Sequence, residues 1–152
     1  MVIPIPIPIP TTPYQAAMRY LGHVEERANG EHPLIQWWLE LCRMGRDQPD
    51  EVAWCSAFVN GIAWQTRRPR SYKANARSWL DVGTPVQLEE ATPGFDVVVF
   101  WRGKKTGWKG HVGFYAGQEG SNILVLGGNQ GNRVCIAPYP KSRLLGCRRL
   151  MA

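Results

Sequence analysis

Apolar residues in the first half of the chain recur at the spacing of amphipathic helices. In residues 14–28 they return every three or four positions, and Asn29-Gly30 then supplies a stop signal. Pro33 and Gly45 bound a second stretch of this kind. The pattern predicts helices over residues 14–28, 34–44, 54–64 and 74–80.

The pattern changes to short β-rich runs after Pro93-Gly94, and glycine and proline clusters separate these runs. The predicted strands cover residues 96–101, 111–116, 123–126, 133–137 and 146–150. Helices followed by strands indicate an α+β fold in which N-terminal helices pack on an antiparallel sheet. We expect one domain over residues 14–152, because no internal repeat or linker interrupts it.

The first ten residues are dominated by an alternation of isoleucine and proline. Proline prevents the apolar helix that a signal peptide or a membrane span requires. We therefore expect an extended arm over residues 1–13, synthesis in the cytoplasm without a signal peptide, and no stable membrane insertion. The arm is interpreted as a flexible tail or as a strap that docks on the domain or on a partner.

Charge and composition restrict the classes of partner. The chain has 152 residues with 44% hydrophobic and 20% charged side chains, which fits a soluble globular domain rather than a disordered or collagen-like chain. The formal net charge of +6 favours an anionic partner such as nucleic acid, anionic lipid or bacterial wall. The basic residues are dispersed and form no nucleic-acid-binding motif, so we do not expect nucleic acid to be the partner.

The four cysteines form neither a CxxC pair nor a zinc-like His/Cys spacing, so we expect no metal site and no redox motif. Reduced, packed thiols are the simplest interpretation, and two disulfides after export are the alternative. Cys55 differs from the others because it stands where a polar loop enters an apolar helix. There the helix dipole and free backbone N–H groups stabilise a nucleophilic thiolate, whereas the alternative is an inert buried thiol.

Two polar residues of the β-rich half qualify as partners for Cys55. His111 begins a predicted strand directly after Lys109-Gly110, where a side chain can face a groove from a fixed backbone. Asn129 follows an apolar strand and is placed to accept the second imidazole N–H, which would fix the ring as a base. An ordinary turn is the other interpretation of the segment Gly-Gly-Asn-Gln at 127–130.

Three ordered blocks carry a resemblance to a known family. Residues 54–59 (WCSAFV), 111–115 (HVGFY) and 127–130 (GGNQ) resemble the CHAP and NlpC-type amidohydrolases, and the likeness covers about residues 14–150. The resemblance implies a papain-like fold and hydrolysis of amide bonds in peptidoglycan without an organic cofactor. It also implies the roles of nucleophile for Cys55, base for His111 and orienter for Asn129.

One position departs from the family pattern. Many CHAP members have an acidic residue two positions before the matching asparagine, where this chain has Gly127. Gln130 is therefore the alternative third member of the catalytic group. Some CHAP proteins bind calcium before the nucleophile, but the spacing of Asp47, Asp50 and Glu51 lacks the alternating ligand series, and we predict no calcium site.

Aromatic residues near these blocks are candidates for substrate contact. We predict Trp54, Trp108 and Gln130 as substrate-binding residues, with core packing as an equal alternative for Trp54. Trp108 is expected to be exposed because it lies among glycines and lysine.

The expected function is that of a phage endolysin, an N-acetylmuramoyl-L-alanine amidase or stem-peptide endopeptidase that acts on the wall in the periplasm. A secreted antibacterial amidase toxin with an immunity protein is one alternative. A catalytically silent module that binds wall or nucleic acid is the other.

Overall fold

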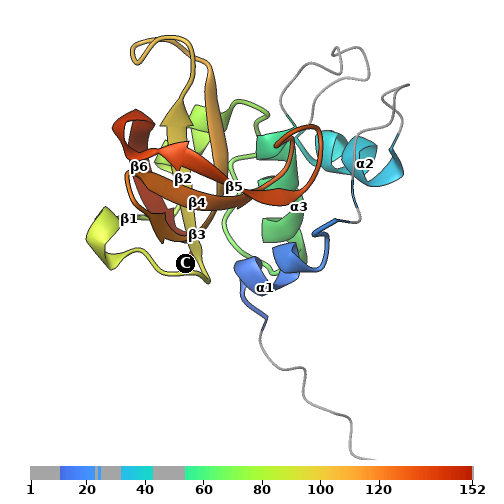
Figure 1. The fold of residues 1–152 in the computed structure, drawn as a ribbon. Coiled ribbons are helices and arrows are strands. Elements are labelled where there is room, and N and C mark those ends of the chain that lie inside the picture. The colour runs from blue at the N-terminus through green and yellow to red at the C-terminus, as the bar shows by residue number, and fades with distance from the viewer. Residues whose placement is uncertain (1–10, 23, 25–31, 43–53, 152) are drawn as a thin grey trace, which may run out of the picture.

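The computed structural model describes residues 11–22, 24, 32–42 and 54–151. Within them the fold is α+β, as the sequence predicts, with helices preceding a six-stranded antiparallel sheet. Figure 1 shows the helices together on one side of the sheet. Residues 1–10 of the predicted arm, and the acidic residues Asp47, Asp50 and Glu51, lie outside the described residues. Pro13, the last residue of the predicted arm, is instead the first residue of a helix, with Thr12 as its N-cap.

The first helix, α1 (Pro13–Met18), is shorter than the helix predicted over residues 14–28. The chain leaves the helix and reaches Gly22 at φ +71°, a conformation that glycine adopts without steric cost. Val24 is buried, and its carbonyl oxygen accepts a hydrogen bond from the Val134 backbone N–H at 2.9 Å. The prediction of one long helix is therefore wrong, because Val24 pairs with a loop beside the sheet instead of continuing a helical face.

The other helices begin close to their predicted positions. They are α2 (Pro33–Leu41), α3 (Cys55–Gln65) and the 3₁₀ helix η1 (Ala76–Asp81), which occupies the place of the helix predicted over residues 74–80. Pro33 is the first residue of α2, a position where its missing N–H costs no hydrogen bond. Two further 3₁₀ turns, η2 (Leu88–Glu90) and η3 (Lys141–Arg143), lie between strands.

The structure confirms all five predicted strands, with ends shifted by up to three residues. They are β2 (Asp96–Trp101), β3 (Gly110–Glu119), β4 (Asn122–Gly127), β5 (Cys135–Pro140) and β6 (Leu144–Arg149). One more strand, β1 (Thr84–Val86), pairs with β6 at an edge of the sheet. Three residues that include a proline are too few to show a strand pattern in the sequence.

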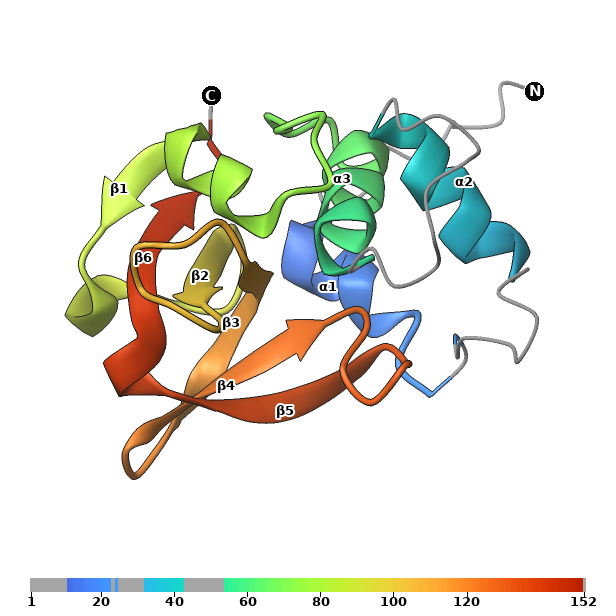
Figure 2. The ribbon, with the colours of Figure 1, turned by 90° about the horizontal axis from the view of Figure 1, so that it is seen from above.

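The sheet is strongly curled. Its strand order is β1-β6-β2-β3-β4-β5, so β3 and β4 separate β2 from β5. Nevertheless, the rings of Phe100 on β2 and Tyr139 on β5 stack with centroids 5.2 Å apart. The curl that brings these strands face to face is visible from above in Figure 2. It places residues from distant strands on one enclosed surface.

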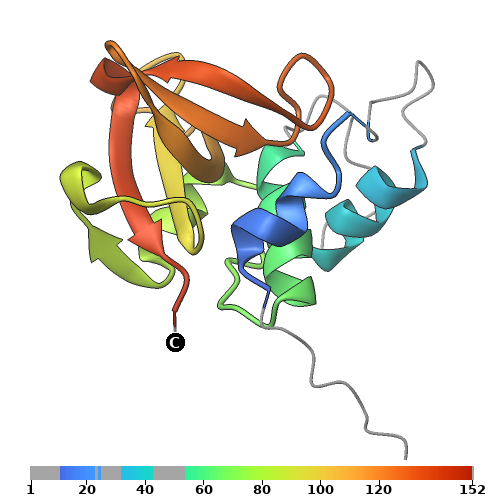
Figure 3. The same cartoon turned by 60° about the horizontal axis from the view of Figure 1, so that its bottom comes forward.

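The pleat of β2 sends alternate side chains into two apolar cores. Val97 and Val99 face the larger core, which lies between the sheet and the helices and includes Phe58 of α3. The smaller core lies inside the curl and contains Val98, Phe100, Tyr115, Ile123, Val125 and Cys147. Figure 3 shows α1, α2 and α3 gathered on the side of the sheet that faces the larger core.

In the described part of the chain, no helix has both the length and the apolar character needed to cross a membrane. The four cysteines are free thiols, and Cys42, Cys55 and Cys147 are buried.

Candidate active site

Cys55 is the first residue of α3, and its side chain is 0% exposed. The N-cap residue is Trp54, whose indole has no acceptor to offer to the first turn of the helix. The backbone N–H groups of this turn are therefore available to a negative charge at the helix end. Helix α3 packs on β3, the strand that carries His111.

A buried polar network fixes the orientation of α3. The Ser56 hydroxyl donates to the Lys73 carbonyl oxygen at 2.6 Å and accepts from the Trp79 indole Nε1 at 2.8 Å. One turn later, the amide oxygen of Asn60 accepts from the Tyr72 backbone N–H at 3.0 Å. These bonds tether the residue after Cys55 to the segment before the sheet, so Cys55 is held on a rigid element.

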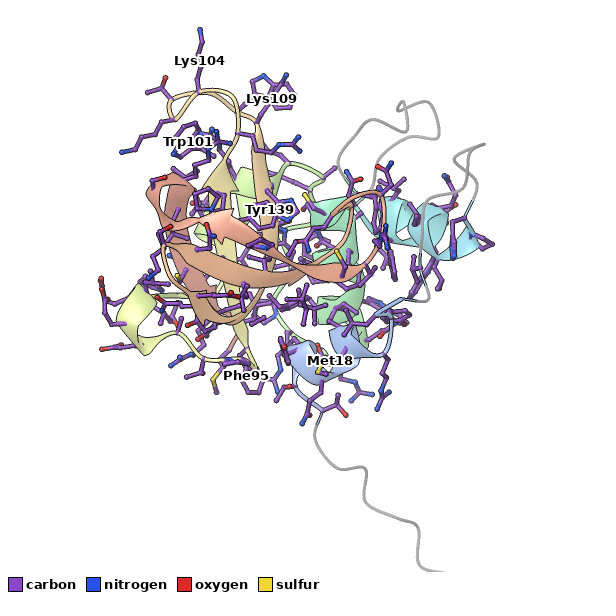
Figure 4. The ribbon with its side chains drawn as sticks, in the orientation of Figure 1. Met18, Phe95, Trp101, Lys104, Lys109 and Tyr139 are labelled. Carbon is purple, nitrogen blue, oxygen red and sulfur yellow. The ribbon has the colours of Figure 1, made fainter. Side chains whose placement is uncertain are left out.

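His111 lies at the beginning of β3, opposite Phe100 of β2, and is 2% exposed. Its Nε2 lies 2.9 Å from the side-chain oxygen of Gln130. Its ring stacks on Tyr139 with centroids 4.5 Å apart and an interplanar angle of 11°. Tyr139 lies on β5 (Figure 4), and Cys55, the first residue of α3, is among the groups that raise its pKa. Two different residues thus restrict both the rotation and the plane of the imidazole.

The surroundings of Gln130 decide which imidazole nitrogen carries the proton. The Gln130 Nε2 group donates to the carbonyl oxygens of Val125 and Cys135 at 3.0 and 2.7 Å. Both amide hydrogens are therefore used, and a flipped amide would place its oxygen against two other acceptors. The Gln130 oxygen must then face His111, and only a protonated Nε2 can donate to it. Nδ1 is left with its lone pair, as a general base requires.

Burial keeps both members of the pair uncharged. It raises the pKa of the Cys55 thiol, although backbone hydrogen bonds from Val112 and Ser56 act in the opposite direction. It lowers the pKa of His111 from 6.5 to about 4, while the hydrogen bond to Gln130 acts to raise it. The resting site at neutral pH is therefore a thiol and a neutral imidazole. A nucleophilic attack by Cys55 would therefore require removal of the thiol proton in the same step.

Asn129, the predicted orienter, lies in the turn that follows β4 and has φ +57°. Asparagine is among the few residues other than glycine that enter this region readily. No hydrogen bond joins its side chain to His111 among the described residues, whereas the next residue, Gln130, makes that bond. The hydrogen bond to His111 is thus made by Gln130, the alternative that the sequence left open.

Position 127 has no room for a side chain, which explains why it holds glycine. A Cβ at position 127 would lie 2.5 Å from the Gln130 side-chain oxygen and 3.4 Å from His111 Nε2. A side chain at this position would therefore point at the same imidazole nitrogen. Gln130 occupies the space that an acidic side chain at 127 would need, and glycine there is required for the Gln130 contact.

The two predicted substrate-contacting tryptophans lie in different environments. Trp108 is 71% exposed on the loop between β2 and β3, as the sequence predicts. Trp54 is 1% exposed and packs on Trp38 with a ring-centroid distance of 6.3 Å and an interplanar angle of 23°. The structure therefore places Trp54 in the core rather than on a substrate surface.

Sequence reasoning did not find Tyr139 or Arg102. Tyr139 contacts His111 only because the sheet curls, and no local pattern encodes that contact. Arg102 follows β2 directly, and its positive charge lowers the pKa of Cys55 and of His111. An arginine directly after an apolar strand is common, so the sequence carries no signal that singles out Arg102.

Among the described residues, no group of three or more His, Cys, Asp or Glu side chains is arranged to hold a metal ion. No protein-family model matches this chain. No curated protein matches it either. The functional assignment therefore depends on the geometry of Cys55, His111 and Gln130.

Proposed function

We propose that the protein is a cysteine-dependent peptidoglycan hydrolase with a papain-like fold of the NlpC/CHAP type. It cleaves either the N-acetylmuramoyl-L-alanine amide or an amide within the stem peptide. The observation that carries this proposal is the Nε2 hydrogen bond of His111 to a fixed Gln130, which leaves Nδ1 basic on a strand that packs against the helix that begins with Cys55. Nucleophile, base and orienter are the three parts that a cysteine amidohydrolase requires.

In the proposed reaction His111 Nδ1 accepts the thiol proton while the Cys55 sulfur forms a bond to the amide carbonyl carbon. The carbon–nitrogen bond then breaks, and the leaving amine receives the proton from Nδ1. A water molecule, deprotonated by the same nitrogen, hydrolyses the thioester and restores the thiol. Gln130 accepts from Nε2 throughout and stabilises the transient imidazolium.

Backbone N–H groups support the negative charge in this scheme. Those of Cys55 and Ser56 at the start of α3, together with Val112 on β3, already favour the thiolate. The groups at the helix end are also suited to the oxyanion that forms when sulfur attacks the carbonyl. Because Cys55 and His111 are almost fully buried, some of the surrounding chain has to move before a peptide reaches the sulfur.

The test is digestion of purified peptidoglycan, followed by mass spectrometry of the new termini. An amidase releases the lactyl-linked alanine amine, whereas an endopeptidase produces new termini within the stem or cross-bridge. Cys55→Ala and Cys55→Ser should fold normally and release no product.

The matched control for these variants is Cys147→Ala. Cys147 is also a buried thiol, with a pKa raised by burial to about 11, but it lies in the core inside the curl. Its replacement should leave turnover close to wild type. Near-native turnover by Cys55→Ala would exclude the proposed mechanism.

We further propose that the enzyme acts as an endolysin in the periplasm. Bacteria that export the protein with an added signal sequence should lyse, and bacteria that retain it in the cytoplasm should not. Export of Cys55→Ala at the same level should leave the cells intact. Lysis by that variant would show that cell death does not depend on wall hydrolysis.

A further inference from the structure

The loop that joins β2 to β3 carries a concentration of positive charge beside the candidate site. Between Asp96 and Glu119 the chain contains no acidic residue. The same interval contains four cationic side chains, and all are exposed: Arg102, Lys104, Lys105 and Lys109. His111 follows the last of them by two residues, so an anion attracted to this loop is brought close to His111 in the chain.

Arg77 of η1 fixes the backbone of this loop. Its guanidinium donates to the carbonyl oxygens of Lys104 and Lys105 at 2.8 Å and to that of Lys109 at 2.7 and 2.9 Å. The loop carbonyls are thus bound to the Arg77 guanidinium, while the Lys109 ammonium lies over the Trp108 ring at 5.7 Å from its centroid. A rigid loop loses little conformational entropy when it binds a ligand.

The strand register places Arg102 on the same face of the sheet as His111. Phe100 pairs with His111 across β2 and β3, and Tyr139 stacks on both rings from that face. Arg102 comes two residues after Phe100, and its backbone N–H continues the pairing by donating to the Lys109 carbonyl at 3.1 Å. Because alternate residues along an extended chain point to the same face, Arg102 shares the face of Phe100 and His111.

Arg102 differs from the arginines that the fold itself uses. Arg149 forms an ion pair with Asp96 at 2.8 Å, and Arg148 donates to two backbone carbonyls. Within the described residues, the Arg102 guanidinium has no hydrogen bond or ion pair. Its charge nevertheless acts on Cys55, His111 and Tyr139, which places it near the reacting groups.

We propose that Arg102 binds a carboxylate of the substrate next to the amide bond that Cys55 attacks. This inference depends on the proposed function and names the substrate class: stem peptides whose acidic residue has a free carboxylate, in preference to peptides in which that group is a carboxamide. A guanidinium matches a carboxylate with two parallel charge-assisted hydrogen bonds. The carboxamide offers a single neutral oxygen and loses most of this interaction.

The experiment measures kcat/KM on two stem peptides that differ only in this carboxylate or carboxamide. The wild-type enzyme should prefer the carboxylate by about ten- to a hundredfold, the range of a charge-assisted hydrogen-bonded pair. Arg102→Gln should lower kcat/KM on the carboxylate by about ten- to a hundredfold more than on the carboxamide, whose rate falls only through the lost positive charge near Cys55 and His111. Arg102→Lys should recover part of the preference, because it retains the charge without the planar fork.

Lys104→Gln is the matched control, because it removes the same charge from the same loop. Figure 4 shows Lys104 at the far tip of the β2–β3 loop, pointing away from the body of the molecule. Its variant should keep the full preference for the carboxylate. If Lys104→Gln removes the preference as completely as Arg102→Gln does, the preference comes from the total positive charge of the loop. The assignment to Arg102 is then wrong.

The remaining outcomes separate this inference from the proposed function. A wild-type enzyme that digests peptidoglycan but cleaves both peptides with equal kcat/KM overturns the role of Arg102 and leaves the hydrolase intact. Equal losses on both peptides in Arg102→Gln also overturn it, because Arg102 would then act only through its charge on Cys55 and His111. A wild-type enzyme that cleaves no wall substrate overturns both proposals together.

Discussion

Replacement of Gln130 distinguishes the two candidates for the orienting residue. Gln130→Met keeps approximately the length of the side chain but removes the acceptor for His111 Nε2 and the donors to Val125 and Cys135. Each buried polar group left without a partner costs about 1–3 kcal/mol. Because the side chain remains large and its neighbours can adjust, we expect the free energy of unfolding to fall by about 2–4 kcal/mol in total.

Gln130→Met should lose more activity than its lower stability explains. A positioned general base typically contributes about 10²–10⁴-fold to the rate, and His111→Ala should lose all of it. In Gln130→Met the imidazole remains but samples both tautomers and other orientations. We therefore expect kcat/KM to fall by about ten- to a hundredfold, measured at a temperature where the variant is fully folded.

The matched control is Asn129→Gly. It removes the neighbouring side chain at φ +57°, where glycine fits without strain, and should change kcat/KM by less than about threefold. Nitrogen NMR of the His111 ring reports the tautomer directly. Its result would not change if Gln130 had only a structural role. The wild-type ring should show the tautomer protonated at Nε2, and Gln130→Met should show a mixture of both. Wild-type turnover in Gln130→Met together with strong loss in Asn129→Gly would refute the argument and return the role to Asn129.

Three other predictions concern the surroundings of His111. The unfolded chain protonates this histidine near pH 6.5 and the folded protein near pH 4, so acidification through that window should reduce the free energy of unfolding by about 3 kcal/mol more in the wild type than in His111→Gln. Urea titrations followed by tryptophan fluorescence measure this difference, and parallel pH dependences would contradict it. Gly127→Ala should lower kcat/KM by about tenfold or more, because its Cβ displaces the Gln130 oxygen; a crystal structure with an undisturbed His111–Gln130 bond would disprove the cause. Tyr139→Phe should keep kcat/KM within about threefold, because the ring that stacks on His111 remains, whereas Tyr139→Ala should lose about tenfold; equal rates for the two variants would show that the stack is unimportant.

The sequence determined the local elements of this protein. The predicted strands and the helix that begins at Cys55 were readable because apolar periodicity and turn residues act within a few positions of each other. For the same reason Cys55 was recognisable at the start of a helix and His111 at the start of a strand. The exposed Trp108 followed from its glycine and lysine neighbours.

The tertiary structure decided which of these residues meet. The choice between Asn129 and Gln130 depends on one left-handed residue in a turn, which rotates the following side chain toward His111. The stack of Tyr139 on His111 depends on the curl of a six-stranded sheet. The early end of α1 depends on a hydrogen bond between Val24 and a residue more than a hundred positions away. These contacts join segments that are distant in the chain, and a pattern with a period of two or four residues contains no information about them.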